Sequence, residues 1–247
     1  MAKDIADFAL DLLVPAAGSS SVGGPITAPI DDLRGSVLAW VNVLDSVRRS
    51  QRKPLIVFSS SAEVYGNPTR FFISEDALIA PISPYEFHKA VCERLAQGYA
   101  ICFNLDILIC RLFSIVGAWQ RRLLIWELYT QVVESESVVW LKGTTVLALS
   151  QSWLCSEQRG ECLVGNVVSG EEITIYNLTA HLRTLADPGK EIRCRGFAEP
   201  GDSLRWCADI SRLRTLAASW HTQPLLMSLQ SCVAEWQAQS ENVSCGG

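Results

Sequence analysis

The chain has 247 residues, 49% of them hydrophobic and 19% charged, which suits one large or two small globular domains. Its 21 lysines and arginines against 26 acidic residues give a net charge of −5, which excludes the basic surface typical of nucleic-acid-binding proteins. The most apolar stretch, residues 105–119, contains Asp106 and Arg111 and is shorter than the ~20 residues of a membrane-spanning helix. The N-terminus lacks the pattern of a signal peptide, so we expect a cytoplasmic protein without a membrane segment.

Strand-like and helix-like segments alternate along the chain. We expect strands around residues 11–16, 55–60 and 105–112. We expect helices around residues 31–50, 84–101, 121–135, 174–186 and 228–239, and a further helical segment at 146–155. In the last of the five helices, apolar residues recur at helical spacing and predict core packing for Leu229, Cys232, Val233 and Trp236. The alternation predicts an α/β fold with a parallel sheet.

Tyr85 and Lys89 form a candidate proton-transfer pair. Ser83 and Pro84 are typical of a helix N-cap and first helical residue, so Tyr85 and Lys89 would lie one turn apart on the same helical face. A neighbouring ammonium lowers the pKa of a phenol from its usual ~10, which predicts a general acid or base. Ser61, at the end of an apolar strand, could hydrogen-bond the same substrate oxygen. The same spacing occurs by chance in amphipathic helices, so a purely structural role stays open at this point.

Three longer stretches carry a family resemblance. Residues 57–68 read VFSSSAEVYGNP, residues 74–95 read SEDALIAPISPYEFHKAVCERL, and residues 105–120 read LDILICRLFSIVGAWQ. They resemble the extended short-chain dehydrogenase/reductase superfamily and, more narrowly, the NAD-dependent sugar-nucleotide epimerases and dehydratases. The resemblance implies that Ser61, Tyr85 and Lys89 are catalytic.

The resemblance also implies a fold and a domain organisation. We expect a truncated Rossmann-like, doubly wound parallel sheet with helices on both faces, followed by a small C-terminal α/β substrate domain. Residues 1–118 would form the incomplete dinucleotide-binding domain. Residues 119–247 would form a mixed segment that contains the substrate-binding domain.

The cofactor that the resemblance implies is NAD or NADP. The residues that would hold it are Ala16, Ala17, Ser59, Ser60, Tyr85 and Lys89. The residues that would bind the nucleotide sugar are Ser20, Ser114 and Arg205. Ser114 stands where the family has a longer asparagine, so its contact could be lost or mediated by water, and a role as a strand-end turn residue is an equal alternative. Arg205 could replace a family arginine whose position is occupied by Glu199, although an exposed surface arginine is the alternative.

The glycine-rich turn that holds the dinucleotide pyrophosphate in this family is absent from the sequence. Gly18, Gly23 and Gly24 follow what resembles the fourth strand of the family, so we interpret them as turn glycines. In a sheet of order 3-2-1-4-5-6, loss of the first three strands would leave the strand at residues 11–17 at an open edge. We therefore expect a homodimer or a partner chain that covers this edge.

The nine cysteines and three histidines show no zinc-ligand spacing and no C-x-x-C pair. We expect buried free thiols, among them Cys102, Cys110 and Cys162, with neither a metal site nor a disulfide framework. His88, on the predicted helix of Tyr85, is expected to be exposed or adjacent to substrate.

Two functions follow from these observations. The first is an NAD(P)-dependent epimerase/dehydratase-like enzyme that acts on a nucleotide-diphosphate sugar through Ser61, Tyr85 and Lys89. The alternative is a degenerate, non-redox family member that serves as a nucleotide-sugar-binding or regulatory subunit. The retained Ser-Tyr-Lys residues favour the enzyme, whereas the missing glycine-rich turn, Ser114 and Glu199 favour the alternative. Neither function predicts a nucleic-acid or membrane partner.

Overall fold

The structure is a computed structural model, and it describes most of the chain. The described residues are 10–18, 28–68, 72–136, 138–141, 146–150, 162–169, 172–194, 207–216 and 223–244. They divide into two compact units, each built from three separate stretches of the chain. The first comprises the described residues of 1–113, 154–167 and 209–219, and the second those of 114–153, 168–208 and 220–247. The predicted domain division at residue 118 stays a prediction.

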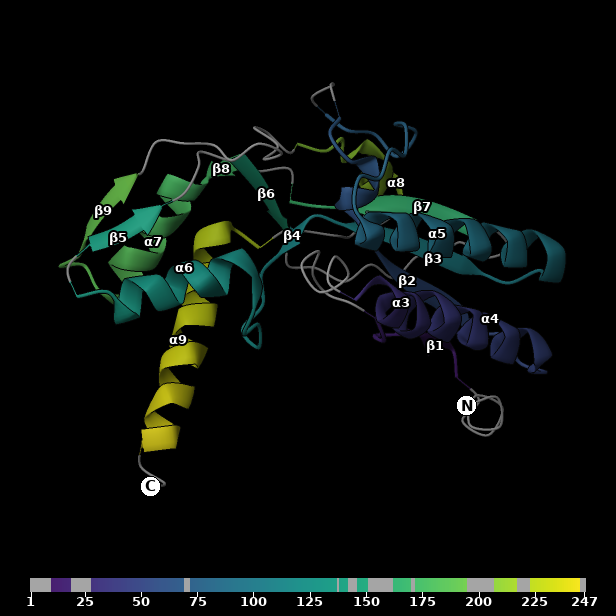
Figure 1. Ribbon diagram of the computed structural model, residues 1–247, viewed down its shortest axis with the longest axis horizontal. Helices are drawn as coiled ribbons and strands as arrows, with labels where there is room; N and C mark the ends of the chain where they lie inside the picture. Colours follow the sequence, from purple (N-terminus) through teal and green to yellow (C-terminus); the bar gives the residue numbers. More distant parts are fainter. Residues whose placement is uncertain are drawn as a thin grey trace. The chain divides into compact units, whose positions relative to one another are not determined.

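A four-stranded parallel sheet organises the first unit (Figure 1). Its order is β1-β2-β3-β7, formed by β1 (Leu12–Leu13), β2 (Leu55–Ser61), β3 (Ile107–Leu112) and β7 (Cys162–Val167). The register pairs Ile56 with Ile107 and Leu112 with Val167. Residues 55–58 of β2 and 107–110 of β3 are unbroken apolar runs because both faces of a parallel sheet are buried. The predicted parallel sheet is confirmed.

Two helical segments cover one face of this sheet. The first is a continuous run of α3 (Pro29–Asp32), the π-helix η1 (Leu33–Leu38) and α4 (Ala39–Arg49), and the second is α5 (Pro84–Phe103). Figure 1 shows α4 and α5 side by side along the sheet. Trp40 stacks on Phe58 with ring centroids 4.4 Å apart, and its Nε1 donates to the Cys92 carbonyl oxygen at 3.0 Å. This indole therefore joins α4, β2 and α5 into one core.

Short elements complete the first unit. The 3₁₀ helix η2 (Ala62–Tyr65) follows β2 directly, and α8 (Ser211–Leu216) packs on β7. Gly66 ends η2 with a φ of 61°, and a Cβ there would lie 2.0 Å from the Ala80 carbonyl oxygen. Only glycine permits this close approach, which fixes the path of the chain between β2 and α5.

Within its described residues, the second unit contains two small sheets and three longer helices. Its strands are β4 (Ser114–Ile115), β5 (Val138–Leu141), β6 (Val146–Ser150), β8 (Glu172–Thr174) and β9 (Glu191–Cys194), in the orders β4-β6-β8 and β5-β9. Its helices are α6 (Leu123–Glu134), α7 (Ile175–Ala186) and α9 (Leu225–Ser244). The core side chains predicted for the last helix are confirmed, because Leu229, Cys232, Val233 and Trp236 are all buried in one cluster.

The structure corrects three of the local expectations. Residues 146–150 form a strand and not a helix, because they pair with β8 and this tertiary partner overrides the local pattern. The strand expected at residues 11–16 is reduced to Leu12–Leu13, since Pro15 cannot donate a ladder hydrogen bond. Cys110 is buried as expected, but Cys102 is exposed on α5.

β1 lies at one edge of the sheet among the described strands, with Leu12 41% exposed. No helix within the described ranges combines the length and the apolar character that a membrane span requires.

Candidate active site

The serine run at the carboxyl end of β2 provides the first side of the site. Successive residues of a strand point to opposite faces, so Ser60 faces away from Ser59 and Ser61. The Ser60 hydroxyl donates to Glu93 Oε1 at 2.5 Å in the buried interior. Ser61, 8% exposed, caps η2 by accepting a hydrogen bond from the Glu63 amide at 3.2 Å. Ligands in open α/β sheets bind beyond such carboxyl ends, which is where Ser61 lies.

Helix α5 provides the second side. Ser83 is its N-cap and Pro84 its first residue, as predicted. The Ser83 Oγ accepts from the Glu86 amide at 3.4 Å and donates to Glu86 Oε1 at 2.9 Å, a variant of the capping box in which the serine hydroxyl and not its amide binds the glutamate. The Glu86 carboxylate also accepts from the Ile82 amide at 2.5 Å. These bonds fix the first turn of α5, from which Tyr85 projects.

Lys89 lies one turn after Tyr85 and is anchored to β2. Its Nζ donates to the Ser59 carbonyl oxygen at 2.7 Å. The same nitrogen lies 5.3 Å from the ring centroid of Phe58 and 5.7 Å from that of Tyr85. Burial lowers the pKa of Lys89, although the nearby acidic groups oppose this shift. The ammonium is thus partly desolvated beside the phenol ring.

Tyr85 is 8% exposed, and burial raises the pKa of its phenol. A hydrogen bond with the Ser61 side chain acts in the opposite direction, while the carboxylates of Glu63, Asp32 and Glu86 raise the pKa further. The expected lowering of the Tyr85 pKa by Lys89 is therefore wrong for this structure. The reason is that burial of the phenol dominates, and the charges of Glu63, Asp32 and Glu86 act in the same direction as burial.

A buried contact between Asp32 and His88 lies beside Tyr85 and Lys89 and was not predicted from the sequence. Asp32, at the end of α3, accepts a hydrogen bond from Ser36 at 3.0 Å and contacts His88 Nδ1 through its other carboxylate oxygen. His88 is on α5 between Tyr85 and Lys89, and its side chain is 14% exposed. The sequence signal was the position of His88 next to Lys89. Its partner could not be inferred because it lies 56 residues away.

A buried network of polar side chains connects the carboxyl ends of β3 and β7 to their neighbours. Arg111 donates to Glu93 at 2.8 Å, to the Tyr65 hydroxyl at 2.8 Å and to the Glu75 carbonyl oxygen at 2.9 Å. Tyr65 in turn donates to Asn166 Oδ1 at 2.7 Å. This network joins β3, β7, η2 and α5, so it fixes the helix that carries Tyr85 and the 3₁₀ helix that Ser61 caps.

The remaining predicted site residues lie outside the serine run of β2 and outside α5. Ala16 and Ala17 are exposed in the turn after β1, followed by Gly18, where a Cβ would lie 3.1 Å from Ser36 Oγ. Ser114 is exposed in β4, which belongs to the second unit. Ser20 and Arg205 are outside the described residues. The described part of the chain contains no cluster of three side chains suited to a metal ion.

Comparison with known proteins places these features in a family context. Residues 1–147 match the model of the NAD dependent epimerase/dehydratase family. The UDP-glucose 4-epimerase of Azospirillum brasilense is 32% identical over 112 residues, which are 45% of this chain and 32% of that protein. UDP-glucuronate 4-epimerase 5 of Arabidopsis thaliana is 25% identical over 155 residues, 62% of this chain and 34% of that protein. The aligned region thus spans about a third of the length of these curated relatives.

Solved structures share the fold over nearly the whole chain. RMD from Pseudomonas aeruginosa complexed with NADPH has a TM-score of 0.84 at 20% identity, covering 97% of this chain and 86% of that chain. UDP-glucuronic acid 4-epimerase from Bacillus cereus in complex with UDP-glucuronic acid and NAD has a TM-score of 0.84 at 20% identity, covering 96% and 78%. At this identity the likeness establishes the Rossmann-type α/β fold.

Proposed function

Because the chain belongs to the NAD-dependent epimerase/dehydratase family, we propose that it acts on a nucleotide-diphosphate sugar with Ser61, Tyr85 and Lys89 as its acid/base residues. The observation that carries this proposal is the placement of Tyr85 between the Ser61 hydroxyl and the Lys89 ammonium at the carboxyl end of β2. The UDP-sugar epimerases among the relatives support the substrate class.

The roles follow from the atoms. Once substrate is bound, the Tyr85 phenol would first release its proton to solvent. The phenolate so formed would take a proton from a sugar hydroxyl and, as the phenol, return it to the sugar oxygen, while the Ser61 hydroxyl would orient the reacting oxygen. Lys89, held by the Ser59 carbonyl oxygen, would stabilise the phenolate as it forms. Burial keeps the phenol protonated before substrate arrives, so in this scheme the site changes protonation state only during reaction.

NAD or NADP would supply the hydride acceptor of this chemistry. The residues that fit the nicotinamide and ribose end are Tyr85, Lys89 and Ser59, together with the small exposed side chains of Ala16 and Ala17. The Ser60 side chain is committed to Glu93, so only its backbone remains for such a contact. The sequence contains no glycine-rich turn for the pyrophosphate, and we assign no residues to that part of the cofactor.

The test compares two tyrosines of the same helix. Tyr85→Phe removes the phenol oxygen, and Tyr99→Phe removes the one on a half-buried tyrosine near the other end of α5. We expect Tyr85→Phe to lower turnover of a UDP-sugar by about 10²–10⁴-fold, the usual contribution of an acid/base group, with ligand affinity retained. Unchanged turnover in Tyr85→Phe would contradict the proposal. Saturable sugar-nucleotide binding without wild-type turnover would instead support the non-redox binding subunit.

We also propose that the chain works as a homodimer or with a partner chain that covers the edge at β1. Exposed apolar side chains on neighbouring helices, Leu33 and Leu38 of η1 and Phe87 and Val91 of α5, support a protein partner. Light scattering of the purified chain decides between one and two copies. A cytoplasmic location remains part of this proposal.

A further inference from the structure

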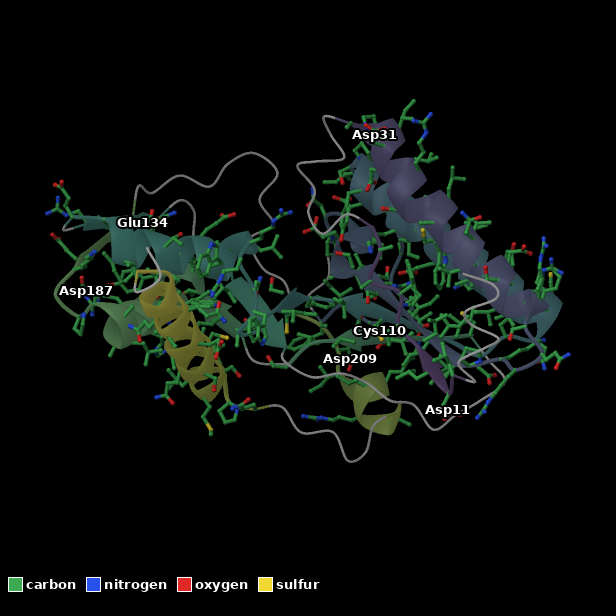
Figure 2. All side chains as sticks on the ribbon, turned by 90° about the horizontal axis from the view of Figure 1, so that it is seen from below. Asp11, Asp31, Cys110, Glu134, Asp187 and Asp209 are labelled. Carbon is green, nitrogen blue, oxygen red and sulfur yellow. The ribbon has the colours of Figure 1, made fainter. Side chains whose placement is uncertain are left out.

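Asp32 differs from its neighbour Asp31 in burial and in the contacts of its carboxylate. Asp31, the third residue of α3, is exposed (Figure 2) and pairs only loosely with Arg34, at 3.7 Å. The Asp32 side chain is 2% exposed, and both of its carboxylate oxygens are engaged, one by Ser36 Oγ at 3.0 Å and the other by His88 Nδ1. Burying a carboxylate costs folding free energy unless the group is hydrogen-bonded and paired. The contacts with Ser36 and His88 offset this cost for Asp32.

The contact lies at the proton-transfer site. His88 follows Tyr85 by three residues and precedes Lys89 directly, so the Asp32–His88 contact holds the turn of α5 that carries both groups. The Asp32 charge reaches both groups, since it raises the pKa of Tyr85 and that of Lys89. A carboxylate has this effect because it disfavours a phenolate and favours an ammonium.

Ser36, the other partner of Asp32, lies close to the turn that follows β1. Ser36 lies in the π-helix η1, an irregularity that is frequent at functional sites. A Cβ on Gly18 would lie 3.1 Å from Ser36 Oγ, so the turn that contains Ala16 and Ala17 packs closely on the Asp32–Ser36 hydrogen bond. Asp32 therefore links this turn to α5.

We propose that Asp32 and His88 form a positioning pair that fixes Tyr85 and Lys89 on α5 and sets the local charge in which their proton transfer takes place. This inference rests on the proposed function in one respect only, the assignment of proton transfer to Tyr85 and Lys89. Neither Asp32 nor His88 is assigned a contact with substrate, so both act through their neighbours. The other titratable groups that act on Tyr85 or Lys89 are Glu63 of η2 and Glu86, Cys92 and Glu93 of α5.

The deciding experiment is a pH titration of the full chain by NMR, with ¹³C at tyrosine Cζ and ¹⁵N at lysine Nζ. The Tyr85 and Lys89 signals are assigned by their loss in Tyr85→Phe and Lys89→Met. The isosteric Asp32→Asn removes the buried charge, and Asp31→Asn removes the adjacent exposed one. We expect Asp32→Asn to shift the titrations of Tyr85 and Lys89 to lower pH and Asp31→Asn to leave both unchanged. Titrations of Asp32→Asn that coincide with those of the wild type would overturn the proposal.

A kinetic comparison tests the positioning role of the imidazole. His88→Asn keeps an N–H donor for Asp32, whereas His88→Leu removes it. We expect His88→Leu to lower kcat roughly tenfold or more with little change in KM, since small displacements of reacting groups are costly, and His88→Asn to recover most of this loss. Equal losses in both variants, or no loss in either, would overturn the proposal.

The two experiments separate this inference from the proposed function. The titration needs no turnover, so it decides the role of Asp32 even where the wild-type chain is inactive. Loss of turnover in Tyr85→Phe, combined with unshifted titrations in Asp32→Asn, would leave the proposed function standing and remove the positioning pair.

Discussion

Lys89 donates to the Ser59 carbonyl oxygen at 2.7 Å, and this bond ties the helix that carries Tyr85 to the strand that carries Ser61. Ser59 and Lys89 are 30 residues apart in the sequence, so the bond is a tertiary restraint on the site. An ammonium held in this way can stabilise a phenolate without moving. The site is then preorganised, because no reorganisation is needed when the charge develops.

Lys89→Met removes this restraint and the charge together. We expect turnover to fall by roughly 10²-fold or more and dinucleotide affinity to fall as well, because Lys89 serves both the acid/base chemistry and the ribose end of the cofactor in the proposed scheme. Lys53→Met is the matched control, since Lys53 also donates to a carbonyl oxygen, that of Phe103 at 2.7 Å, but on the surface. Equal activity in the two variants would remove Lys89 from the site.

Glu63 gives the protein a specific pH dependence. Burial raises its pKa above the ordinary 4.5, and the charge of Glu86 raises it further. The folded state therefore binds more protons than the unfolded state above pH 4.5, so stability falls as pH rises from 4.5 through the raised pKa. We expect Glu63→Gln to be more stable than the wild type at neutral pH and to lose this slope. Urea unfolding at several pH values measures it, with the exposed Glu134→Gln as the control (Figure 2).

The Arg111–Glu93 pair is the most buried ion pair among the described residues, with side chains 3% and 1% exposed. Arg111→Met leaves the Glu93 charge buried without its partner, which we expect to cost about 3–5 kcal/mol of unfolding free energy. Arg52→Met removes a surface pair with Asp11 at 2.6 Å and should leave the urea midpoint unchanged. A wild-type midpoint for Arg111→Met would show that the network does not support the strand ends.

Substitution of Ser83 tests how much its N-cap contributes to the stability of α5. Ser83→Ala removes the N-cap and its bond to Glu86, and we expect a loss of about 1 kcal/mol. Ser46→Ala, which removes a hydroxyl bonded to the Asn42 carbonyl oxygen within α4, should cost less. Thermal unfolding of the two variants at one pH compares them, and equal effects would argue against a capping role.

Local features of the fold could be predicted well from the sequence. The N-cap at Ser83, the buried stripe on the last helix and the parallel sheet all follow from short-range patterns, and the structure confirms them. The Asp32–His88 contact and the network around Arg111 could not be predicted, because each joins residues distant in the sequence. The Tyr85 pKa was mispredicted for a related reason. Helical spacing shows that Lys89 is near, but not that burial and three carboxylates outweigh it.

We propose that the site around Tyr85 binds a dinucleotide and a nucleotide sugar together. Calorimetric titration of the purified chain with NAD⁺, NADH and NADPH, each with and without a panel of nucleotide-diphosphate sugars, tests it most directly. We predict saturable binding of one dinucleotide and one sugar nucleotide, both retained in Tyr85→Phe, with dinucleotide binding lost or weakened in Lys89→Met. Binding of neither ligand by the folded wild-type chain would contradict the account.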